Sequence, residues 1–350
     1  MAEMTANRVF NRPGVVVEGW YWVLRAGDLK RGRTAAVTVM GRDLVAYRTQ
    51  PGRPVLMDAY CPHMGCHLAL GRVEGDCLRC FFHNWSFGPD GSCVDVPSMA
   101  RPPRQARCRV WPAREKYGLI WVWTGAGEPE HEVPENPELQ ETGCDFVLGK
   151  PRRKRCHPNV MMINAIDEQH FRTVHGVPGE LLQMEPAVRS NRNIRFANSA
   201  RVPRHNAWFR FLARFYRGPL RYELSYWYGS NGFVTMGPDF LHLYLLFALR
   251  ESADGGSESQ TVAMTRRRPG LWGWVINRVV LLTTRLAGDY FSVGDTRVFQ
   301  SIRFDYRTPV AADRAVQAFI RHLDGQPLAE WLERPQRPEE LNKPEQEDNA

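Results

Sequence analysis

The stretch CPHMGCHLALGRVEGDCLRCFFH, residues 61–83, contains four cysteines and three histidines. Two pairs stand out within it, Cys61-x-His63 and Cys80-x-x-His83, with sixteen residues between them. Turn-forming residues flank each pair, so two loops can each present two ligands to a metal. We therefore expect a metal site with two cysteine and two histidine ligands in this part of the chain.

Two kinds of metal site use this ligand set. A structural zinc site usually places its two histidines close together at the end of a helix. A Rieske [2Fe–2S] centre instead binds one iron through two cysteines and the other iron through two histidines. Each pair in this sequence combines one cysteine with one histidine, as the iron–sulfur centre requires. We therefore favour the [2Fe–2S] cluster over zinc.

The second pair lies in CFFHNWSF, residues 80–87, which resembles the C-P-F-H-G-W-x-F/Y loop of Rieske oxygenases and their ferredoxins. Phe81 and Asn84 replace the usual Pro and Gly, but asparagine tolerates the left-handed backbone that glycine adopts. Respiratory Rieske proteins carry an extra disulfide between the two loops. Cys66 occupies its first position and Phe82 its second, so the resemblance excludes that disulfide here.

A second group of candidate ligands lies in INAIDEQHFRTVHG, residues 163–176. Asn164, Asp167, His170 and His175 follow the order N-x-x-D-x-x-H-x4-H, which resembles the mononuclear iron site of Rieske non-haem iron oxygenases. An Fe(II) ion that binds O2 needs two histidines and one carboxylate on one face, so that the opposite positions stay open. The pattern therefore indicates a second, mononuclear iron site.

The position of His175 requires a break in the helix. It lies five residues beyond His170 and would point from another face of a continuous helix, so we expect the helix to end or distort near residues 173–176. The resemblance implies that the third ligand comes from far along the chain. Asp289 and Asp295 are the candidates, and Asp295 is favoured because the stretch after it fits the family pattern better.

The two halves of the chain differ in their sequence patterns, and together they predict an α+β fold. Residues 15–127 read as short β segments separated by turns, which with the resemblance predicts an all-β Rieske domain. Residues 128–333 alternate helical and strand-like runs, and the resemblance implies a helix-grip-like catalytic domain. Residues 334–350 are almost wholly polar and are expected to be disordered. The expected helices cover residues 160–175, 271–288 and 311–323.

Two segments allow more than one interpretation. Residues 271–288 are the most apolar, but Arg278 and Arg285 argue against a membrane-spanning helix. A core helix is the first interpretation, and an interfacial helix or the wall of a channel for a hydrophobic substrate is the second. The basic run at residues 150–155 is interpreted as a solvated loop, with a docking site for an acidic partner as the alternative.

Charge and the N-terminal sequence bear on location and partners. The net charge is +8 and the isoelectric point is about 9.2, but no nucleic-acid-binding motif accompanies the basic residues. The start of the chain lacks the apolar segment of a signal peptide, so a cytoplasmic protein with reduced cysteines is expected. No spanning segment is expected, and a peripheral membrane contact stays open.

The resemblance implies an enzyme, a Rieske-type non-haem iron monooxygenase similar to the homotrimeric ketosteroid hydroxylases and cholesterol desaturases. Such an enzyme uses O2 and electrons from NAD(P)H, delivered by a separate ferredoxin or reductase. In the family, the cluster of one subunit lies next to the mononuclear iron of its neighbour. Asp167 is then the expected bridge, accepting hydrogen bonds from His83 across the interface and from His170 within the subunit.

The substrate can be predicted only as a class. Residues 208–247 are dense in aromatic side chains, and with residues 271–288 they favour a sizeable hydrophobic substrate such as a steroid, a terpenoid or an alkylated polycycle. Hydroxylation, desaturation and oxidative cyclisation share this machinery. The alternatives are an aromatic-ring-hydroxylating dioxygenase subunit and a Rieske electron-transfer protein with a docking domain.

Overall fold

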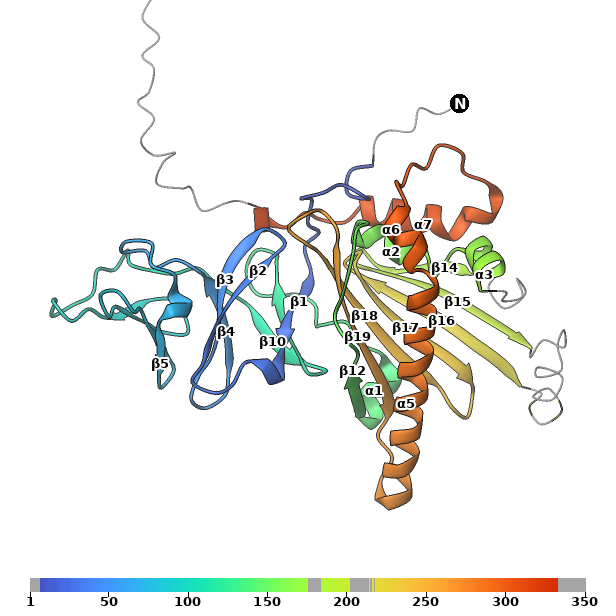
Figure 1. Cartoon of the computed structure of the whole chain (residues 1–350), viewed down its shortest axis with the longest axis horizontal. Helices are drawn as coiled ribbons and strands as arrows, with labels where there is room; N and C mark the ends of the chain where they lie inside the picture. The colour runs from blue at the N-terminus through green and yellow to red at the C-terminus, as the bar shows by residue number, and fades with distance from the viewer. Residues whose placement is uncertain (1–6, 176–183, 202–213, 215, 217, 333–350) are drawn as a thin grey trace, which may run out of the picture.

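The computed structural model describes residues 7–175, 184–201, 214, 216 and 218–332 of the chain. Its first half, blue to cyan in Figure 1, is built from short strands, and its second half combines one large sheet with helices. The expected α+β fold is therefore confirmed. The polar tail expected at residues 334–350 lies outside the described residues.

The first half forms small antiparallel sheets, because turns interrupt its valine- and tyrosine-rich runs every few residues. The strand orders are β1-β11-β10, β2-β3-β4-β9 and β5-β6-β7-β8. The strands are β1 (Trp20–Arg25), β2 (Thr34–Val39), β3 (Arg42–Arg48), β4 (Pro54–Asp58), β5 (Arg72–Glu74), β6 (Cys77–Arg79), β7 (Ser86–Phe87), β8 (Cys93–Asp95), β9 (Val110–Trp111), β10 (Ala113–Lys116) and β11 (Leu119–Trp123). Short 3-10 turns are η1 (Ala26–Asp28) and η2 (Leu68–Leu70).

The second half is organised around one antiparallel sheet in the order β12-β19-β18-β17-β16-β15-β14, with β13 paired to β19. The strands are β12 (Cys144–Leu148), β13 (Arg152–Lys154), β14 (Glu185–Ser190), β15 (Asn193–Arg201), β16 (Pro219–Trp227), β17 (Asn231–Pro238), β18 (Leu243–Glu251) and β19 (Ser257–Arg266). The long register between β15 and β16, from Asn193 opposite Trp227 to Arg201 opposite Pro219, keeps the central strands continuous.

Helices cover this sheet and its end. They are α1 (Pro137–Thr142), α2 (Pro158–Ile163), α3 (Glu168–Val174), α5 (Gly270–Gly294), α6 (Thr296–Ser301) and α7 (Arg314–Asp324), with 3-10 turns η4 (Ala311–Asp313) and η5 (Glu330–Leu332). The long helix α5 packs on β12, β18 and β19, whereas α2, α6 and α7 gather at one end of the sheet (Figure 1).

The helices expected at residues 271–288 and 311–323 are confirmed as α5 and α7, but two other expectations were wrong. The single helix expected over residues 160–175 is two helices, α2 and α3, with a break between them. The basic run at residues 150–155 is not a solvated loop, because it contains strand β13. Lys154 Nζ donates to Thr296 Oγ1 at 2.6 Å, which ties this strand to the start of α6.

The two halves meet in a buried, largely aromatic core. Its members from both halves include Trp20, Trp22, Trp121, Trp123, Tyr228, Phe233 and Leu246. The Arg250 guanidinium crosses the junction and donates to the backbone carbonyls of Trp22 at 2.9 Å and Val23 at 3.0 Å. Glu258 balances its charge through a contact of 2.7 Å. A dry aromatic core with a neutralised charge fixes the two halves relative to each other.

The end of the described chain returns to the first half. Val17 and Leu328 form a β-bridge, and the buried Trp331 ring packs 4.6 Å from the Trp111 ring. The buried Arg42 side chain donates to the Trp331 carbonyl at 2.8 Å. The sequence patterns gave no indication of this contact, which joins the first and last described parts of the chain in one core.

Candidate metal centres

Two loops with the same hydrogen-bonding pattern carry the predicted cluster ligands. In the first, the Cys61 amide donates to the carbonyl five residues ahead at 2.9 Å, and the Gly65 amide donates back to the Cys61 carbonyl at 2.9 Å. The second loop repeats this from Cys80, with bonds of 2.8 Å and 3.2 Å and with Asn84 in the place of Gly65. Gly65 has φ 72° and Asn84 has φ 58°, so the left-handed backbone expected at Asn84 is confirmed.

These loops bring the four predicted cluster ligands together. The thiols of Cys61 and Cys80 lie within hydrogen-bonding contact of each other, and both residues are buried. The rings of His63 and His83 lie 4.7 Å apart and are exposed. A Rieske cluster needs this arrangement of sulfur ligands on one iron and imidazoles on the other. The residues therefore fit a [2Fe–2S] cluster whose histidine side faces outward.

The environment of the sulfur ligands also fits a metal. Burial raises the pKa of the Cys61 thiol to about 12, and the neighbouring Cys80 adds to this effect. Such a thiol is neutral at pH 7, so it becomes a ligand only where the positive charge of a metal stabilises the thiolate. Trp85 stacks on the His63 ring at 4.3 Å with an interplanar angle of 8°, which fixes the orientation of that imidazole.

The second centre brings His170, His175 and Asp295 together. Helix α3 ends at Val174, as expected, and His175 takes the C-cap position. Asp295 lies between α5 and α6, with its Oδ1 atom 3.0 Å from His170 Nε2 and 2.8 Å from His175 Nε2. One potential ligand atom from each residue lies within 4.8 Å of the others. The trio therefore has the two-histidine, one-carboxylate composition of a mononuclear iron site.

The two remaining residues of the sequence pattern lie beside this trio. The Asn164 side-chain nitrogen is 3.0 Å from His170 Nε2. Asp167 caps helix α3, and its Oδ1 atom accepts from the backbone amides of Gln169 at 2.9 Å and His170 at 3.2 Å. The described contact between Asp167 and His170 therefore involves the backbone amide, whereas the sequence led us to expect the imidazole. The side chain of Asp289 lies outside the described part of the chain.

A cavity of about 380 Å3 adjoins the trio, and His175 and Asp295 form part of its wall. Most of the other lining side chains are apolar, including Met162, Tyr226, Val234, Leu245 and Phe247. Several belong to the aromatic-rich stretch 208–247, although its first residues lie outside the described part. Of helix α5, Thr284 and Gly288 face the cavity. The candidate iron ligands thus meet an apolar space of ligand size.

Sequence reasoning missed several polar residues that line this cavity away from the candidate iron ligands. Arg152, assigned to a solvated run, lines it together with Ser259 and Thr261 of β19. The strand assignment of residues 152–154 depends on pairing with β19, a segment about a hundred residues away, so no local signal could have shown it.

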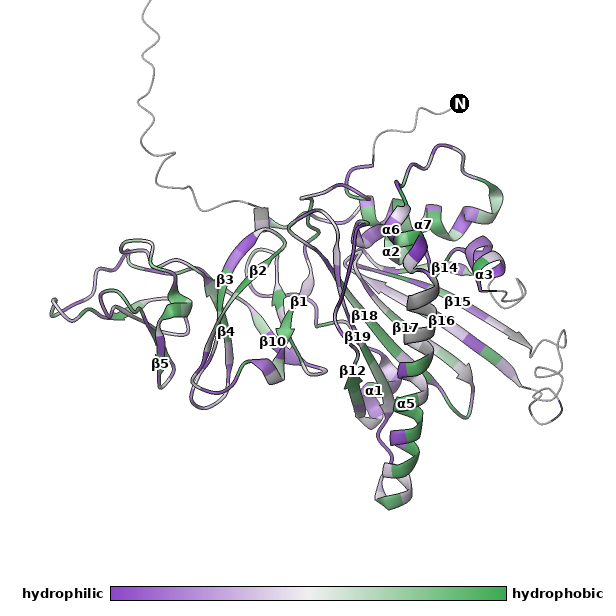
Figure 2. Cartoon of the chain, viewed as in Figure 1, coloured by the Kyte–Doolittle hydropathy of each residue, from purple (hydrophilic) through white to green (hydrophobic). Residues whose placement is uncertain are grey.

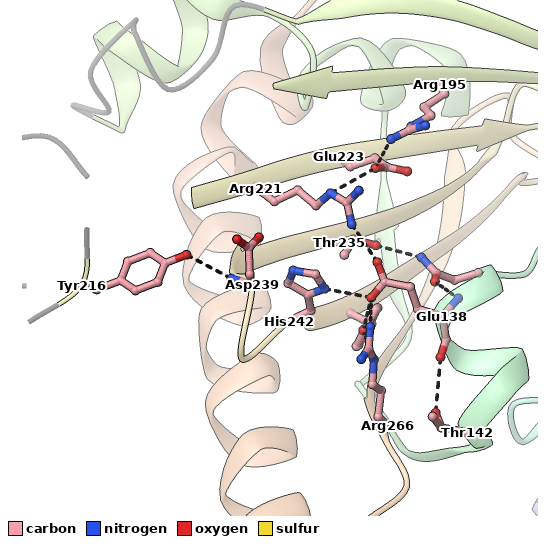
Figure 3. Close-up of polar contacts among 12 residues, drawn as sticks. Glu138, Thr142, Arg195, Tyr216, Arg221, Glu223, Thr235, Asp239, His242 and Arg266 are labelled. Carbon is pink, nitrogen blue, oxygen red and sulfur yellow. Dashed lines mark hydrogen bonds and ion pairs between the residues drawn. The ribbon is translucent and has the colours of Figure 1, made fainter. Parts of the chain in front are cut away.

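A network of polar side chains, shown in Figure 3, lies beside the cavity. It adjoins the cavity at Arg221, which is one of the lining residues. Its centre is Glu138 of α1, which accepts hydrogen bonds from Arg221 at 2.8 Å, from Tyr244 at 2.7 Å and from His242 at 2.8 Å. Arg266 forms a further ion pair with the same carboxylate. Asn136 and Pro137, just before Glu138, form the usual start of a helix, but the sequence analysis expected no helix here.

The network sets the ionisation of Glu138. Partial burial opposes its negative charge, but hydrogen bonds from Tyr244, His242 and Arg266 outweigh burial and lower the pKa of Glu138 to about 2. A carboxylate with a lowered pKa stabilises the folded state above its ordinary pKa of 4.5, and this contribution is lost as the pH falls toward about 2. Glu138 is therefore expected to act as an ionised anchor that holds the β16, β18 and β19 side chains in place.

We expect Glu138→Gln to lower the free energy of unfolding at pH 7 by about 2 kcal/mol, since hydrogen bonds to a charged group are replaced by weaker ones. The difference from wild type should be smaller at pH 3, where the unfolded wild-type carboxyl is already protonated. Urea unfolding at both pH values measures this. An equal difference at the two pH values would show that the charge of Glu138 is not the cause.

Comparison with known proteins follows the same division of the chain. The family described as the Rieske [2Fe-2S] domain matches residues 19–113. A protein named cholesterol 7-desaturase nvd 1, from Ciona intestinalis, is 39% identical over 166 residues, which are 47% of this chain and 35% of that protein. The oxygenase component of 3-ketosteroid-9-alpha-monooxygenase from Rhodococcus rhodochrous is 33% identical over 165 residues, 45% of this chain and 42% of that protein. The alignments thus span less than half of these relatives.

Solved structures extend the similarity to most of the fold. NdmA of Pseudomonas putida CBB5, solved with caffeine, superposes with a TM-score of 0.68 at 18% identity and covers 87% of this chain and 90% of that chain. Dicamba monooxygenase superposes with a TM-score of 0.61 at 16% identity, covering 88% of this chain and 96% of that chain. Residues 19–113 are therefore a Rieske [2Fe–2S] domain, and the chain is related in sequence to Rieske oxygenases and shares their fold.

Proposed function

We propose that this chain is the terminal oxygenase component of a Rieske-type system, which uses O2 and external electrons to oxidise a sizeable hydrophobic substrate. The observation that carries the proposal is the grouping of His170, His175 and Asp295 beside an apolar cavity, which His175 and Asp295 line, in a chain that also has a Rieske domain. An iron ion held by this trio would supply O2 activation with electrons from the cluster.

The residues around the trio have separate tasks in this proposal. His170, His175 and Asp295 would hold the metal, and the adjoining cavity would admit O2 and substrate. The side-chain nitrogen of Asn164 lies 3.0 Å from His170 Nε2, so Asn164 borders the position that the metal would take. Apolar lining side chains exclude bulk water, which protects a reactive centre from side reactions.

The proposed substrate is a steroid or a similar fused-ring lipid. A cavity of about 380 Å3 falls within the range of about 300–1,000 Å3 that is usual for small-molecule sites. The names of two relatives refer to cholesterol and to a 3-ketosteroid, which supports a steroid. Arg152, Ser259 and Thr261 offer the few polar groups that would fix the orientation of a mostly apolar molecule.

We test this function by supplying the purified holoprotein with a generic ferredoxin, a ferredoxin reductase and NADPH, and by screening sterols and ketosteroids. We expect a product whose mass has risen by one oxygen atom or fallen by two hydrogen atoms. Its formation should require O2. The same screen with terpenoids and polycyclic aromatics covers the wider class. Reduction and reoxidation of the cluster with no product from any hydrophobic substrate would favour an electron-transfer protein instead.

The electron donor and the oligomer belong to the same proposal. A net charge of +8 suits an acidic ferredoxin, because opposite charges speed docking. In Figure 1 the small sheet β5-β6-β7-β8, which adjoins the cluster loops, lies at one end of the chain and α3 lies at the other. Electrons would therefore pass between subunits, as in a homotrimer. A cytoplasmic setting would keep Cys61 and Cys80 reduced for cluster assembly.

The surface around the cluster histidines supports such a contact. Large apolar side chains are exposed there, namely Tyr60, Met64, Phe81 and Phe82. An exposed apolar patch surrounded by polar residues often marks a site of interaction with another protein. In the proposed trimer, a neighbouring subunit covers these side chains and brings its own α3 toward His83.

We expect that mixing two inactive variants restores activity if electrons cross between subunits. His83→Ala removes a cluster ligand, and His170→Ala removes an iron ligand, so neither variant should turn over alone. Chains coexpressed in equal amounts and assembled at random should recover about a quarter of wild-type activity, since an intact cluster meets an intact iron site at about one contact in four. No recovery in rings shown by mass to be mixed would contradict transfer between subunits.

A further inference from the structure

Helix α5 has an apolar face that points away from the protein. Leu271 and Trp272 are 75% and 79% exposed, respectively. The other large apolar side chains exposed along α5 are Trp274, Val275, Ile276, Val279, Leu282 and Leu286. At about 100° per residue, this set spans more than half of the helix circumference. Figure 2 shows the same segment largely in green, on the part of α5 that extends past the edge of the sheet.

The opposite side of α5 is already used for folding. Val280, Leu281 and Thr284 are buried, and the helix packs on β12, β18 and β19. The outward apolar side chains are therefore not needed for packing against this sheet. A surface helix of a globular protein normally turns charged and polar residues outward. The outer face of α5 instead presents mostly apolar side chains over about four turns.

The charges along the apolar part of this helix and just before it all have one sign. Residues 266–288 contain five arginines and no aspartate or glutamate. Arg267, Arg278 and Arg285 are exposed, and the Arg278 guanidinium lies 5.4 Å from the Trp274 ring. A helix that combines exposed tryptophan and leucine with flanking arginines has the composition of an interfacial membrane helix. Arginine can reach the headgroups while its stem lies along the apolar surface.

We propose that the outer face of α5, residues 271–286, docks the protein on an anionic lipid bilayer, with the helix lying in the plane of the interface. The apolar side chains enter the acyl boundary, and the arginines contact lipid phosphates. Among the residues that the structure describes, no helix has the length and apolarity needed to cross a membrane. An in-plane contact is the membrane contact that this helix can make.

A second copy of the chain suits this face less well. A symmetric contact would place the same arginines of both copies near each other, and like charges in an interface are costly. The apolar arc is also wider than the narrow seam through which two helices pack. In a bilayer, lipid phosphates would neutralise the arginines, and the acyl chains could bury all of the exposed apolar side chains of this face.

This docking would also connect the membrane with the proposed substrate site. Thr284 and Gly288 of the same helix line the cavity beside the candidate iron ligands. A lipid-soluble substrate could then leave the bilayer next to the element that borders its binding site. This part of the inference rests on the proposed function, whereas the membrane contact itself does not.

The test is flotation of the full-length holoprotein with vesicles of roughly three parts phosphatidylcholine to one part phosphatidylglycerol. We expect wild type to float with these vesicles and the double variant Trp272→Glu/Val279→Glu to bind at least about tenfold more weakly. Both side chains are exposed, so the fold should tolerate the changes. Val188→Glu, at an exposed position on β14, is the matched control and should bind as wild type does.

A second variant tests the electrostatic part. Arg278→Gln should lower binding to the anionic vesicles more than binding to pure phosphatidylcholine, and added salt should have the same effect. Wild type that stays unbound, or a double variant that binds equally, would overturn the proposal. So would a double variant that only changes the oligomer size, because the face would then be a subunit contact. Vesicle binding needs neither O2 nor electrons, so its failure leaves the proposed oxidation untouched.

Discussion

Replacing His170 by alanine is expected to remove the mononuclear iron and to abolish substrate oxidation while the Rieske cluster stays in place. The iron content should fall from about three to about two atoms per chain. The reason is geometric, because His170 Nε2 and His175 Nε2 both approach Asp295 Oδ1, at 3.0 Å and 2.8 Å, and one imidazole with one carboxylate leaves too few protein ligands. Turnover should fall by more than about 100-fold, the upper cost of losing only a partner of a metal ligand.

The visible absorption of the oxidised cluster distinguishes this loss from misfolding, since it should match wild type in His170→Ala. His131→Ala, a histidine outside both centres, is the matched control and should keep about three irons per chain. Three irons in His170→Ala, or full turnover, would show that His170 is not an iron ligand.

Replacing Asp167 by asparagine is expected to lower turnover by about 10- to 100-fold while both metal centres stay loaded. In the proposed trimer, the Asp167 carboxylate links α3 of one subunit to a cluster histidine of the next, and its charge holds that imidazole in position. Asparagine keeps the shape of the side chain but cannot supply the charge. Stopped-flow reoxidation of the reduced cluster by O2 should show the slower step directly.

The structure makes this substitution more informative, because Asp167 also caps helix α3 through the amides of Gln169 and His170. Asparagine caps a helix about as well as aspartate, so Asp167→Asn isolates the charge. Asp167→Ala removes the cap as well and should destabilise the protein by about 1 kcal/mol. Full activity in Asp167→Asn would leave only the capping role.

Local spacing explains why part of the metal chemistry could be predicted. The pairs Cys61/His63 and Cys80/His83 lie within short loops, so the sequence alone limits where their side chains can meet. His170 and His175 are equally local, and the helix end near residue 174 followed from their spacing once both were taken as ligands of one iron. Asp295 was the harder case, since it reaches the histidines only through the packing of α5 and α6.

Features that depend on long-range packing could not be predicted. The return of Trp331 to the first half and the pairing of residues 152–154 with β19 have no local pattern. The outer face of α5 shows the limit differently. Its apolar character was visible in the sequence and favoured a core helix over an interfacial one, and only the structure shows which of its residues are exposed.

The central claim is that one chain holds two iron centres, a cluster at the Cys61 and Cys80 loops and a single iron at His170, His175 and Asp295. The most direct test is anomalous X-ray scattering at the iron absorption edge from crystals of the holoprotein. We expect one strong peak between the two loops and a separate peak in contact with the three side chains of the second centre. A peak at the loops alone, in protein whose second site was offered Fe(II), would contradict the account.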